Sequence, residues 1–270
     1  MNMIMDKYNS FMKHIIDWTA ISDDDRYGRQ IVLKYAMEQL ETCKNGKVLD
    51  LAAGCGDDLV NIKNRCKGEN HQFYALDAYP PNVKLLREKG ISVSAADIER
   101  EVFPFDDSYF DVVIANQILE HCKELFWIFS EVQRILKPGG VFIIGVPNLA
   151  SSHCRLMLLF GMMPPCIETF GPHVRGFTYK DFRWFIESGD YFKVEQCDGS
   201  GRFTFLPFAK KWISKAFPKS DVGLFLKARR TYKTEGQFLD ILQTCVLGTN
   251  YYVGEGVGYE FVNENETGIY

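Results

Sequence analysis

Residues 47–58, with the sequence Lys-Val-Leu-Asp-Leu-Ala-Ala-Gly-Cys-Gly-Asp-Asp, constrain the fold more than any other part of the chain. The apolar first part has the composition of a buried strand, and Gly54 and Gly56 permit a sharp turn in which no side chain blocks a ligand. A strand, a glycine turn and a helix in this order are typical of a nucleotide-binding α/β sheet. Asp50 and the two aspartates after the turn would repel a pyrophosphate, so we expect a ligand with a positive charge, such as an amino group or a sulfonium.

Strands and helices alternate through the part of the chain that follows. The apolar patterns predict strands at 47–51, 72–76, 91–95, 111–115 and 141–146, and helices at 59–66, 82–89 and 124–136. Two more strands are predicted at 192–197 and 223–228, with a helix at 178–187 before them. The repeated strand–helix–strand order predicts an α/β fold with a doubly wound, mostly parallel sheet.

Polar motifs follow the ends of the predicted strands. Asp77 comes 21 residues after Gly56 and closes the second strand, where a carboxylate can accept hydrogen bonds from two ribose hydroxyls. Asp97 follows the third strand. Three further motifs are Pro-Phe-Asp-Asp-Ser-Tyr-Phe-Asp-Val-Val-Ile-Ala-Asn at 104–116, Gln-Ile-Leu-Glu-His at 117–121 and Leu-Lys-Pro-Gly-Gly at 136–140. Ligands of open α/β sheets bind beyond the carboxyl ends of the strands, so these motifs predict one binding site.

Taken in order, the motifs resemble those of the class I S-adenosylmethionine-dependent methyltransferases, over residues 48 to about 148. The resemblance implies a seven-stranded Rossmann-like sheet with an antiparallel last strand, and S-adenosylmethionine as the cofactor. It implies that the cofactor is bound by Asp50, Ala52, Gly54, Gly56, Asp77, Ala78, Asp97, Ile98, Asn116 and Gln117. Ala52 departs from the family, which usually has a glycine there, and we expect this alanine to keep a negative φ.

Two other classes of protein share part of this pattern. A nicotinamide-dependent oxidoreductase has the same strand–turn–helix order and an acid near the position of Asp77, but Leu59 lies where its fingerprint needs a third small residue. It would also leave Asp97 unexplained. A methyltransferase-like module without catalytic activity would keep the same motifs, although the intact carboxylates and glycines favour a working cofactor site.

The segment Gly-Pro-His-Val-Arg-Gly-Phe-Thr at 171–178 resembles an element of small-molecule methyltransferases, some of them associated with bacterial surface glycans. We predict His121 and His173 as catalytic bases, because imidazole titrates near neutrality, and Arg175 and His153 as contacts of the acceptor. Each histidine could instead hold a helix end or a loop. The predicted reaction is O-methylation of a small polar acceptor such as a sugar, a nucleotide-linked or a phosphoryl-containing glycan precursor of a capsule or polysaccharide; a quinone or natural-product acceptor is the alternative.

Charge and cysteine content narrow the partners. A net charge of −4, with 31 basic and 35 acidic residues, argues against nucleic-acid binding through phosphate neutralisation. The eight cysteines form no Cys-x-x-Cys pair, and the pairs His121-Cys122 and His153-Cys154 match no common zinc spacing, so no metal site is predicted.

No apolar stretch is long enough to span a bilayer, and the amino terminus lacks the apolar region of a secretory signal, so we expect a cytoplasmic protein. We divide the chain into a helical cap at 1–45, a cofactor-binding domain at 46–230 and an extension at 231–270. The irregular segment 149–176 is predicted to form a lid or acceptor-binding insertion. A homodimer is left open.

Overall fold

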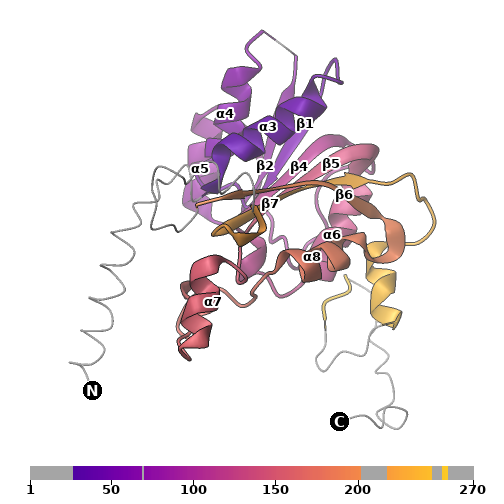
Figure 1. Cartoon of the computed structure of the whole chain (residues 1–270). Helices are drawn as coiled ribbons and strands as arrows, with labels where there is room; N and C mark the ends of the chain where they lie inside the picture. Colours follow the sequence, from indigo (N-terminus) through magenta and orange to yellow (C-terminus); the bar gives the residue numbers. More distant parts are fainter. Residues whose placement is uncertain (1–26, 69, 202–217, 245–250, 255–270) are drawn as a thin grey trace.

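The computed structural model describes residues 27–68, 70–201, 218–244 and 251–254 (Figure 1). Most of the predicted amino-terminal cap (1–26) and parts of the carboxyl-terminal extension (245–250 and 255–270) lie outside the described residues.

A seven-stranded sheet with the strand order β3-β2-β1-β4-β5-β7-β6 forms the centre of the molecule. The pairs from β3 to β5 are parallel, whereas β7 runs antiparallel to both β5 and β6. This topology confirms the predicted mostly parallel sheet with antiparallel strands at one edge. The strands are β1 (Lys47–Leu51), β2 (Gln72–Leu76), β3 (Ser92–Ser94), β4 (Phe110–Asn116), β5 (Leu136–Pro147), β6 (Phe192–Ser200) and β7 (Gly223–Arg230).

Helices cover both faces of the sheet, which explains why its central strands are nearly uniformly apolar (Figure 1). One face packs against α3 (Arg29–Leu40), α4 (Asp57–Arg65) and α5 (Pro80–Glu88), and the other against α6 (Leu125–Ile135) and α8 (Tyr179–Glu187). Successive strand residues point to opposite faces, so Val112 and Ile114 belong to the first core and Val113 and Ala115 to the second. Helix α3 is therefore an integral part of one core layer.

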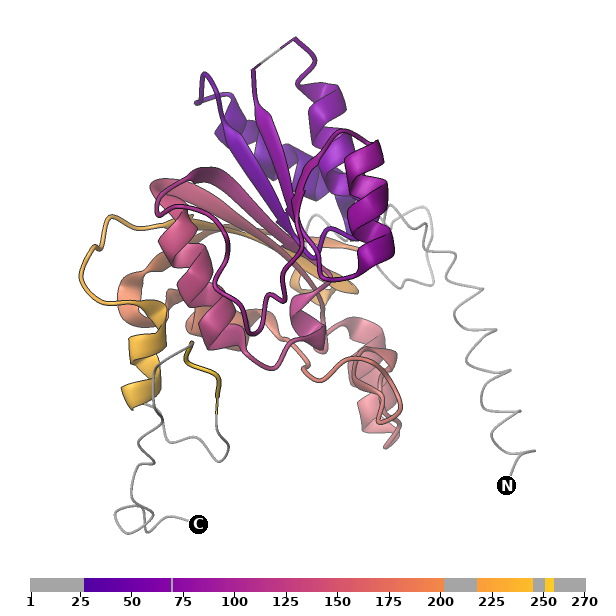
Figure 2. The same ribbon diagram turned by 180° about the vertical axis from the view of Figure 1, so that it is seen from behind.

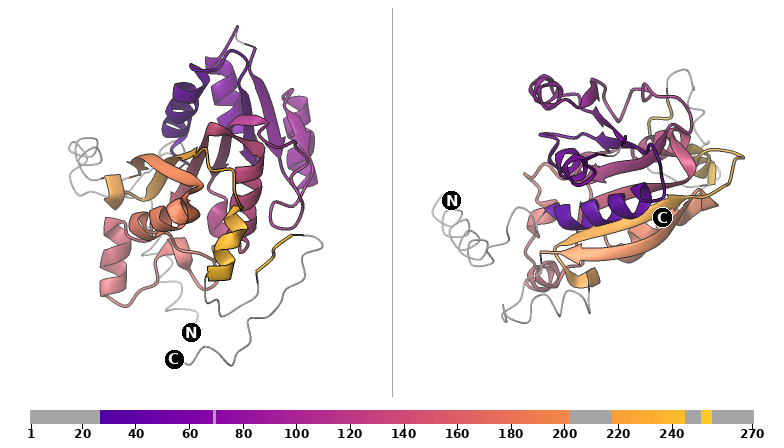
Figure 3. Two further views of the ribbon diagram at one scale, coloured as in Figure 1. Left: turned by 90° about the vertical axis from the view of Figure 1, so that its right-hand side faces the viewer. Right: turned by 90° about the horizontal axis from the view of Figure 1, so that it is seen from above.

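The carboxyl-terminal extension also contributes to the core. The 3-10 segment η6 (Phe238–Thr244) lies against α6, as Figure 3 shows. Phe238 is fully buried, and its ring centroid lies 5.0 Å from that of Phe129. This contact explains why α6, which is covered by the sheet on one side and by η6 on the other, is buried almost all round.

The sequence predicts a helix to residue 136 and a strand from residue 141, but the structure places the Leu-Lys-Pro-Gly-Gly motif (136–140) inside strand β5. Strand β5 begins at Leu136, directly after α6, and Leu136 pairs with Phe110 at the start of β4. Backbone hydrogen bonds from Ser108 and Tyr109 to the last carbonyls of α6 fix this arrangement.

The segment predicted as a lid contains a helix, α7 (Ser152–Leu159), which projects away from the sheet in both Figure 1 and Figure 2. The two ends of the segment 149–176 are held together, because the amide of Leu149 donates a hydrogen bond to the carbonyl of Phe177 and Asn148 forms a β-bridge with Phe177. Among the described residues, no helix has the length and apolar character needed to cross a membrane.

Candidate functional site

The glycine turn predicted from the sequence joins β1 to α4. Gly54 has a φ of +55° and Gly56 a φ of +75°, both in the left-handed region that glycine tolerates. The amide of Gly54 donates a 2.9 Å hydrogen bond to Oδ2 of Asp77, which ties the turn to the end of β2. A Cβ added at Gly54 would meet nothing within 4 Å, so the turn presents its backbone to open space.

Ala52 does not adopt the negative φ that we expected. Its φ is +52°, so this non-glycine residue has the left-handed conformation that the family's usual glycine would adopt without strain. A left-handed conformation costs an L-residue about 1–2 kcal/mol. The surrounding bonds impose it, because the amide of Ala53 donates to the carbonyl of Leu76 and the amide of Gly56 donates to the carbonyl of Ala53.

Three carboxylates gather at the ends of β1 and β2. Asp50, Asp58 and Asp77 are all buried, at 4%, 8% and 5% exposure. Burial, and then repulsion from Asp58 and Asp77, raises the pKa of Asp50 well above its ordinary value, while Arg29 opposes the shift. Burial also raises the pKa of Asp58. These acids are short of positive charge, which is the electrostatic condition for binding a cationic ligand.

Asn116 and Gln117, at the end of β4, bring unpaired polar atoms to the same place. The Nδ2 of Asn116 donates to Oδ2 of Asp58 at 2.8 Å and to the carbonyl of Tyr27 at 2.9 Å. Oδ1 of Asn116, Oδ1 of Asp58 and Nε2 of Gln117 are buried and have no hydrogen-bond partner in the part of the chain that the structure describes. Buried polar groups are normally satisfied, so these atoms indicate a ligand. We call Asp50, Asp58, Asp77, Asn116 and Gln117 the polar edge.

The polar edge has the functional groups that S-adenosylmethionine requires. Its unpaired acceptors and buried acids suit the ammonium of an amino acid, and the free amide of Gln117 suits a carboxylate. Asp77 is held by the amides of Gly54 and Tyr79 and by Nδ2 of Asn82, which fixes its orientation. Ala78 is exposed beside it.

Asp97 and Ile98 follow β3, next to β2 in the sheet, as the sequence predicted. Oδ1 of Asp97 accepts a 2.8 Å hydrogen bond from the amide of Glu99, and the Asp97 amide donates to Oε1 of Glu101 at 2.7 Å. Ile98 is buried in the core beneath. The local bonds hold the Asp97 side chain in one orientation.

The second part of the site begins at the short 3-10 turn η1 (Leu119–His121), directly after the polar edge. The rings of His121 and His173 meet edge to face, with centroids 4.7 Å apart, although the two residues are distant in sequence. The returning lid segment is held there because the amide of Val174 donates a 2.8 Å hydrogen bond to the carbonyl of Glu120. The structure thus brings the two predicted catalytic histidines together.

Glu120 lies beneath the histidine pair and is 1% exposed. Its Oε1 is 4.0 Å from Nε2 of His121, and its Oε2 is buried without a hydrogen-bond partner. Burial raises the pKa of Glu120 to about 7. Burial also lowers the pKa of His121, and repulsion from His173 lowers it further, whereas the hydrogen bond with the carbonyl of Pro172 opposes this shift. Glu120, His121 and His173 are called the His–Glu cluster below.

The two predicted acceptor contacts have other partners in the structure. The guanidinium of Arg175 donates to the carbonyls of Cys122 and Lys123, at 3.2 and 2.6 Å, and to the hydroxyl of Tyr251 at 3.3 Å. His153 lies on α7, with Nδ1 3.1 Å from Oγ of Ser151 and Nε2 3.4 Å from Sγ of Cys154. Arg175 therefore fastens the lid to the start of α6 in this structure.

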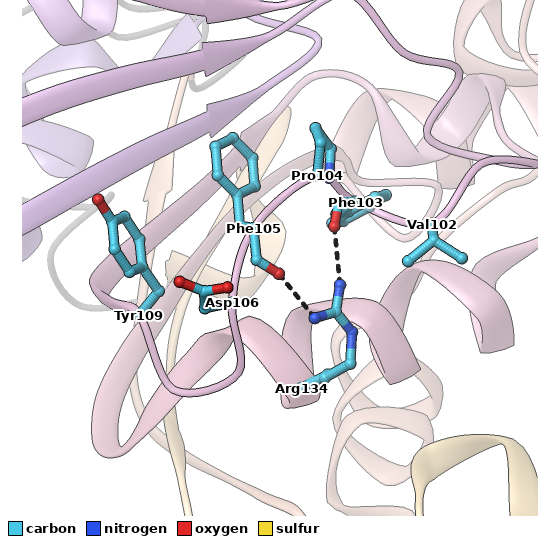
Figure 4. Close-up of a pocket in the computed structure, with 7 residues that line it drawn as sticks. All are labelled: Val102, Phe103, Pro104, Phe105, Asp106, Tyr109 and Arg134. Carbon is cyan, nitrogen blue, oxygen red and sulfur yellow. Dashed lines mark hydrogen bonds between the residues drawn. The ribbon is translucent and has the colours of Figure 1, made fainter.

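The first part of the 104–116 motif has a structural role at the start of β4, whereas its last residue, Asn116, belongs to the polar edge at the other end of that strand. Figure 4 shows a hollow lined by Arg134 and by residues of the segment 102–109. Arg134 donates to the carbonyls of Phe103 and Phe105, at 2.8 and 2.7 Å, and forms an ion pair with buried Glu131. This hollow adjoins the start of β4, whereas the polar edge lies at its end.

The sequence indicated Asp58 only as one of the acids that would repel a pyrophosphate and favour a cationic ligand, and it indicated no role for Glu120. Both lie inside recognisable motifs, so the signal was present, but their burial and their unpaired oxygens come from tertiary packing. A glutamate next to a candidate histidine in the 117–121 motif was the signal for Glu120.

Comparisons with known proteins agree with this geometry. Residues 49–144 match the family model of a methyltransferase domain. The chain is 29% identical, over 192 residues, to a demethylmenaquinone methyltransferase of Chlorobaculum tepidum, covering 66% of this chain and 78% of that one. It is 33% identical, over 117 residues, to a ubiquinone/menaquinone biosynthesis C-methyltransferase of Proteus mirabilis, covering 41% and 46% of the two chains. An S-adenosylmethionine-dependent methyltransferase structure from Aquifex aeolicus superposes with a TM-score of 0.50 at 16% identity, covering 81% of this chain and 98% of the other.

Proposed function

We propose that this chain, a class I S-adenosylmethionine-dependent methyltransferase, methylates a hydroxyl of a small-molecule acceptor held between η1 and the lid segment 149–176. The observation that carries the proposal is the contact between the rings of His121 and His173. His121 comes four residues after Gln117, the last residue of the polar edge, so this contact lies just beyond the polar edge. The cofactor supplies a methyl group on positively charged sulfur. The polar edge would bind its amino-acid part, and Asp77, Ala78, Asp97 and Ile98 its ribose and adenine, as the resemblance implies.

The two histidines would promote loss of the acceptor's proton. Nδ1 of His121 lies 3.2 Å from the carbonyl of Pro172, and Nδ1 of His173 lies 3.0 Å from the carbonyl of Cys166. A carbonyl only accepts, so each Nδ1 carries a hydrogen, and in the neutral form of each ring the lone pair lies on Nε2. Fixing both rings in this way also positions the acceptor, and positioning alone supplies much of the rate of a displacement at carbon.

A polar acceptor, such as a sugar or a nucleotide-linked or phosphoryl-containing glycan precursor of a capsule or polysaccharide, is the first candidate. Its hydroxyl is weakly acidic, so it needs the assistance that the histidine pair provides. Arg175 and His153 remain proposed contacts of this acceptor, and binding would require the Arg175 guanidinium to share or exchange its present carbonyl partners.

A quinol-type or natural-product acceptor is the second candidate, and the lid favours it. Large apolar side chains are exposed along α7 and after it, namely Leu156, Leu158, Leu159, Phe160, Met163 and Phe170. An exposed apolar surface beside an active site suits an acceptor with an apolar body. The two relatives named above are also quinone-pathway enzymes, and methylation of a ring carbon next to a hydroxyl would again begin with loss of the hydroxyl proton.

The test uses S-adenosylmethionine with a labelled methyl group and a panel of nucleotide-sugars, phosphorylated metabolites and quinols. We expect label transfer to one class, with the His121→Ala and His173→Ala variants slowed by about 100- to 10,000-fold, the usual contribution of acid–base assistance. Both variants should still bind S-adenosylhomocysteine, which shows that they are folded. Unchanged turnover in both variants would refute the role of the histidines, and absence of S-adenosylhomocysteine binding in the wild type would refute the cofactor assignment.

The remaining assignments stay predictions: a cofactor-binding domain at 46–230 with the insertion 149–176, flanking segments at 1–45 and 231–270, and a cytoplasmic location; a homodimer stays open. Analytical ultracentrifugation of the whole chain would measure its oligomeric state.

A further inference from the structure

We propose that Glu120, His121 and His173 bind one divalent transition-metal ion, with a coordination position left open for the acceptor hydroxyl. The role toward the acceptor rests on the proposed function, whereas the metal site itself does not. One ligand atom from each of the three residues lies within 4.8 Å of the others.

The orientation of the two imidazoles is the first argument. Metal-binding histidines usually donate their second ring N–H to a carbonyl or carboxylate, which fixes the tautomer and aims the free nitrogen at the ion. Both rings of the His–Glu cluster show this pattern, through the carbonyls of Pro172 and Cys166. Two backbone carbonyls from the lid thus prepare two Nε2 lone pairs.

Glu120 is the second and independent argument. Its carboxyl group is almost completely buried, yet Oε2 has no hydrogen-bond partner among the described residues, and Oε1 lies 4.0 Å from Nε2 of His121. In the neutral tautomer assigned above, Nε2 carries no hydrogen to donate. Nitrogen and oxygen acceptors therefore gather where a buried carboxyl group meets two partly exposed imidazoles, and a cation among them would turn the repulsion between these groups into attraction.

The ligand set indicates the type of ion. Two imidazoles and a carboxylate suit zinc, iron, cobalt or manganese rather than calcium or magnesium, which favour oxygen ligands. With metal–ligand bonds of about 2.0–2.1 Å, tetrahedral ligand atoms lie about 3.3 Å apart, so the three residues would need to close in by roughly 1 Å or less on average. Three protein ligands are typical of catalytic zinc sites, in which the remaining position receives water or substrate.

The ion would act on the acceptor as a Lewis acid. It withdraws electron density from the bound hydroxyl, whose proton then passes to a solvent water. The acceptor oxygen forms a bond to the methyl carbon while the carbon–sulfur bond breaks and its electron pair returns to sulfur. His121 and His173 would then promote loss of the proton as ligands of the ion instead of accepting the proton themselves.

The test is titration of the chelator-treated chain with Co²⁺, whose visible absorption reports coordination by nitrogen and oxygen. We expect one Co²⁺ per chain. Glu120→Gln, His121→Ala and His173→Ala should each weaken binding by more than the roughly 10- to 100-fold that a change in an outer-shell partner causes. S-adenosylhomocysteine binding by the same variants confirms that they are folded.

A second site must be excluded, because Sγ of Cys154 lies 3.7 Å from Sγ of Cys166 in the lid and two thiols also bind cobalt. The Cys154→Ser/Cys166→Ser variant should keep the Co²⁺ spectrum. Loss of the spectrum in that variant, or no Co²⁺ binding by the wild type, would overturn the metal site. Methyl transfer that persists in the metal-free enzyme would overturn the ion's role toward the acceptor, whereas Co²⁺ binding without any methyl transfer would contradict the proposed function and leave the metal site standing.

Discussion

Replacement of Asp50 by asparagine is expected to change two properties in opposite directions. Asp50 is a buried carboxylate that has no hydrogen-bond partner among the described residues, and burial and two neighbouring acids raise its pKa. In the free protein the charge is unfavourable, so Asp50→Asn should not destabilise the fold. In the complex the same charge would attract the cationic part of the cofactor, so the variant should bind the cofactor weakly.

The magnitudes follow from burial. Truncating one partner of a buried, hydrogen-bonded charge pair costs about 2–5 kcal/mol, which corresponds to roughly a 30- to 4,000-fold loss of affinity. Asparagine removes the charge but is still polar, so the variant should gain only about 1 kcal/mol in the free energy of unfolding without ligand. This is the lower end of the penalty for an unpartnered buried group. That free energy corresponds to a rise in Tm of about 2–4 °C.

Calorimetry with S-adenosylhomocysteine measures the affinity, and thermal unfolding without ligand measures the stability. Asp57→Asn is the matched control, because Asp57 is half-exposed and pairs with Arg29 at 3.0 Å and Lys89 at 3.6 Å. Losing such pairs should lower stability by at most about 1 kcal/mol and leave affinity nearly unchanged. If Asp50→Asn lowered the Tm while keeping full affinity, Asp50 would be a structural residue and the electrostatic argument would be wrong.

Two further predictions concern pH and the core. The pKa of Asp50 is raised in the free protein, and a cationic ligand needs the carboxylate ionised, so binding should release a proton. The affinity for S-adenosylhomocysteine should therefore increase as pH rises through the raised pKa in the wild type but not in Asp50→Asn. Calorimetry in buffers of different ionisation enthalpy would detect the released proton. Arg134→Leu should lower the free energy of unfolding by about 3–5 kcal/mol, because it leaves the Glu131 carboxylate buried without its cation. A loss below about 1 kcal/mol in denaturant titrations would show that the Arg134–Glu131 ion pair contributes as little as a surface pair.

The central strands β1, β4 and β5 could be predicted from the sequence because they are largely buried on both faces and therefore contain continuous apolar runs. Strand β2 lies at the predicted residues 72–76, and the antiparallel pairing of β6 and β7 is confirmed. The conformation of Ala52 was predicted wrongly, because the next residue, Ala53, is bonded to Leu76 on β2, a tertiary contact that the local sequence does not show. The meeting of His121 with His173 could be proposed but not measured, and the burial of Glu120 had no sequence signal of its own.

Backbone strain and unbalanced buried charge occur together just beyond the carboxyl ends of two central strands. Among the described residues, only Ala52, Ser108, Gln117 and Asp190 are non-glycine residues with positive φ, and Ala52 and Gln117 end the two central strands β1 and β4. Strain of this kind costs of the order of 1–3 kcal/mol at each residue and persists only where the surrounding structure imposes it. Here the two residues with imposed geometry directly follow β1 and β4, beside buried acids and unpaired polar atoms. A ligand that pairs with these groups removes part of their electrostatic penalty. The packing of the two large cores holds the groups in place with or without the ligand, so the site is complementary to its ligand before the ligand binds.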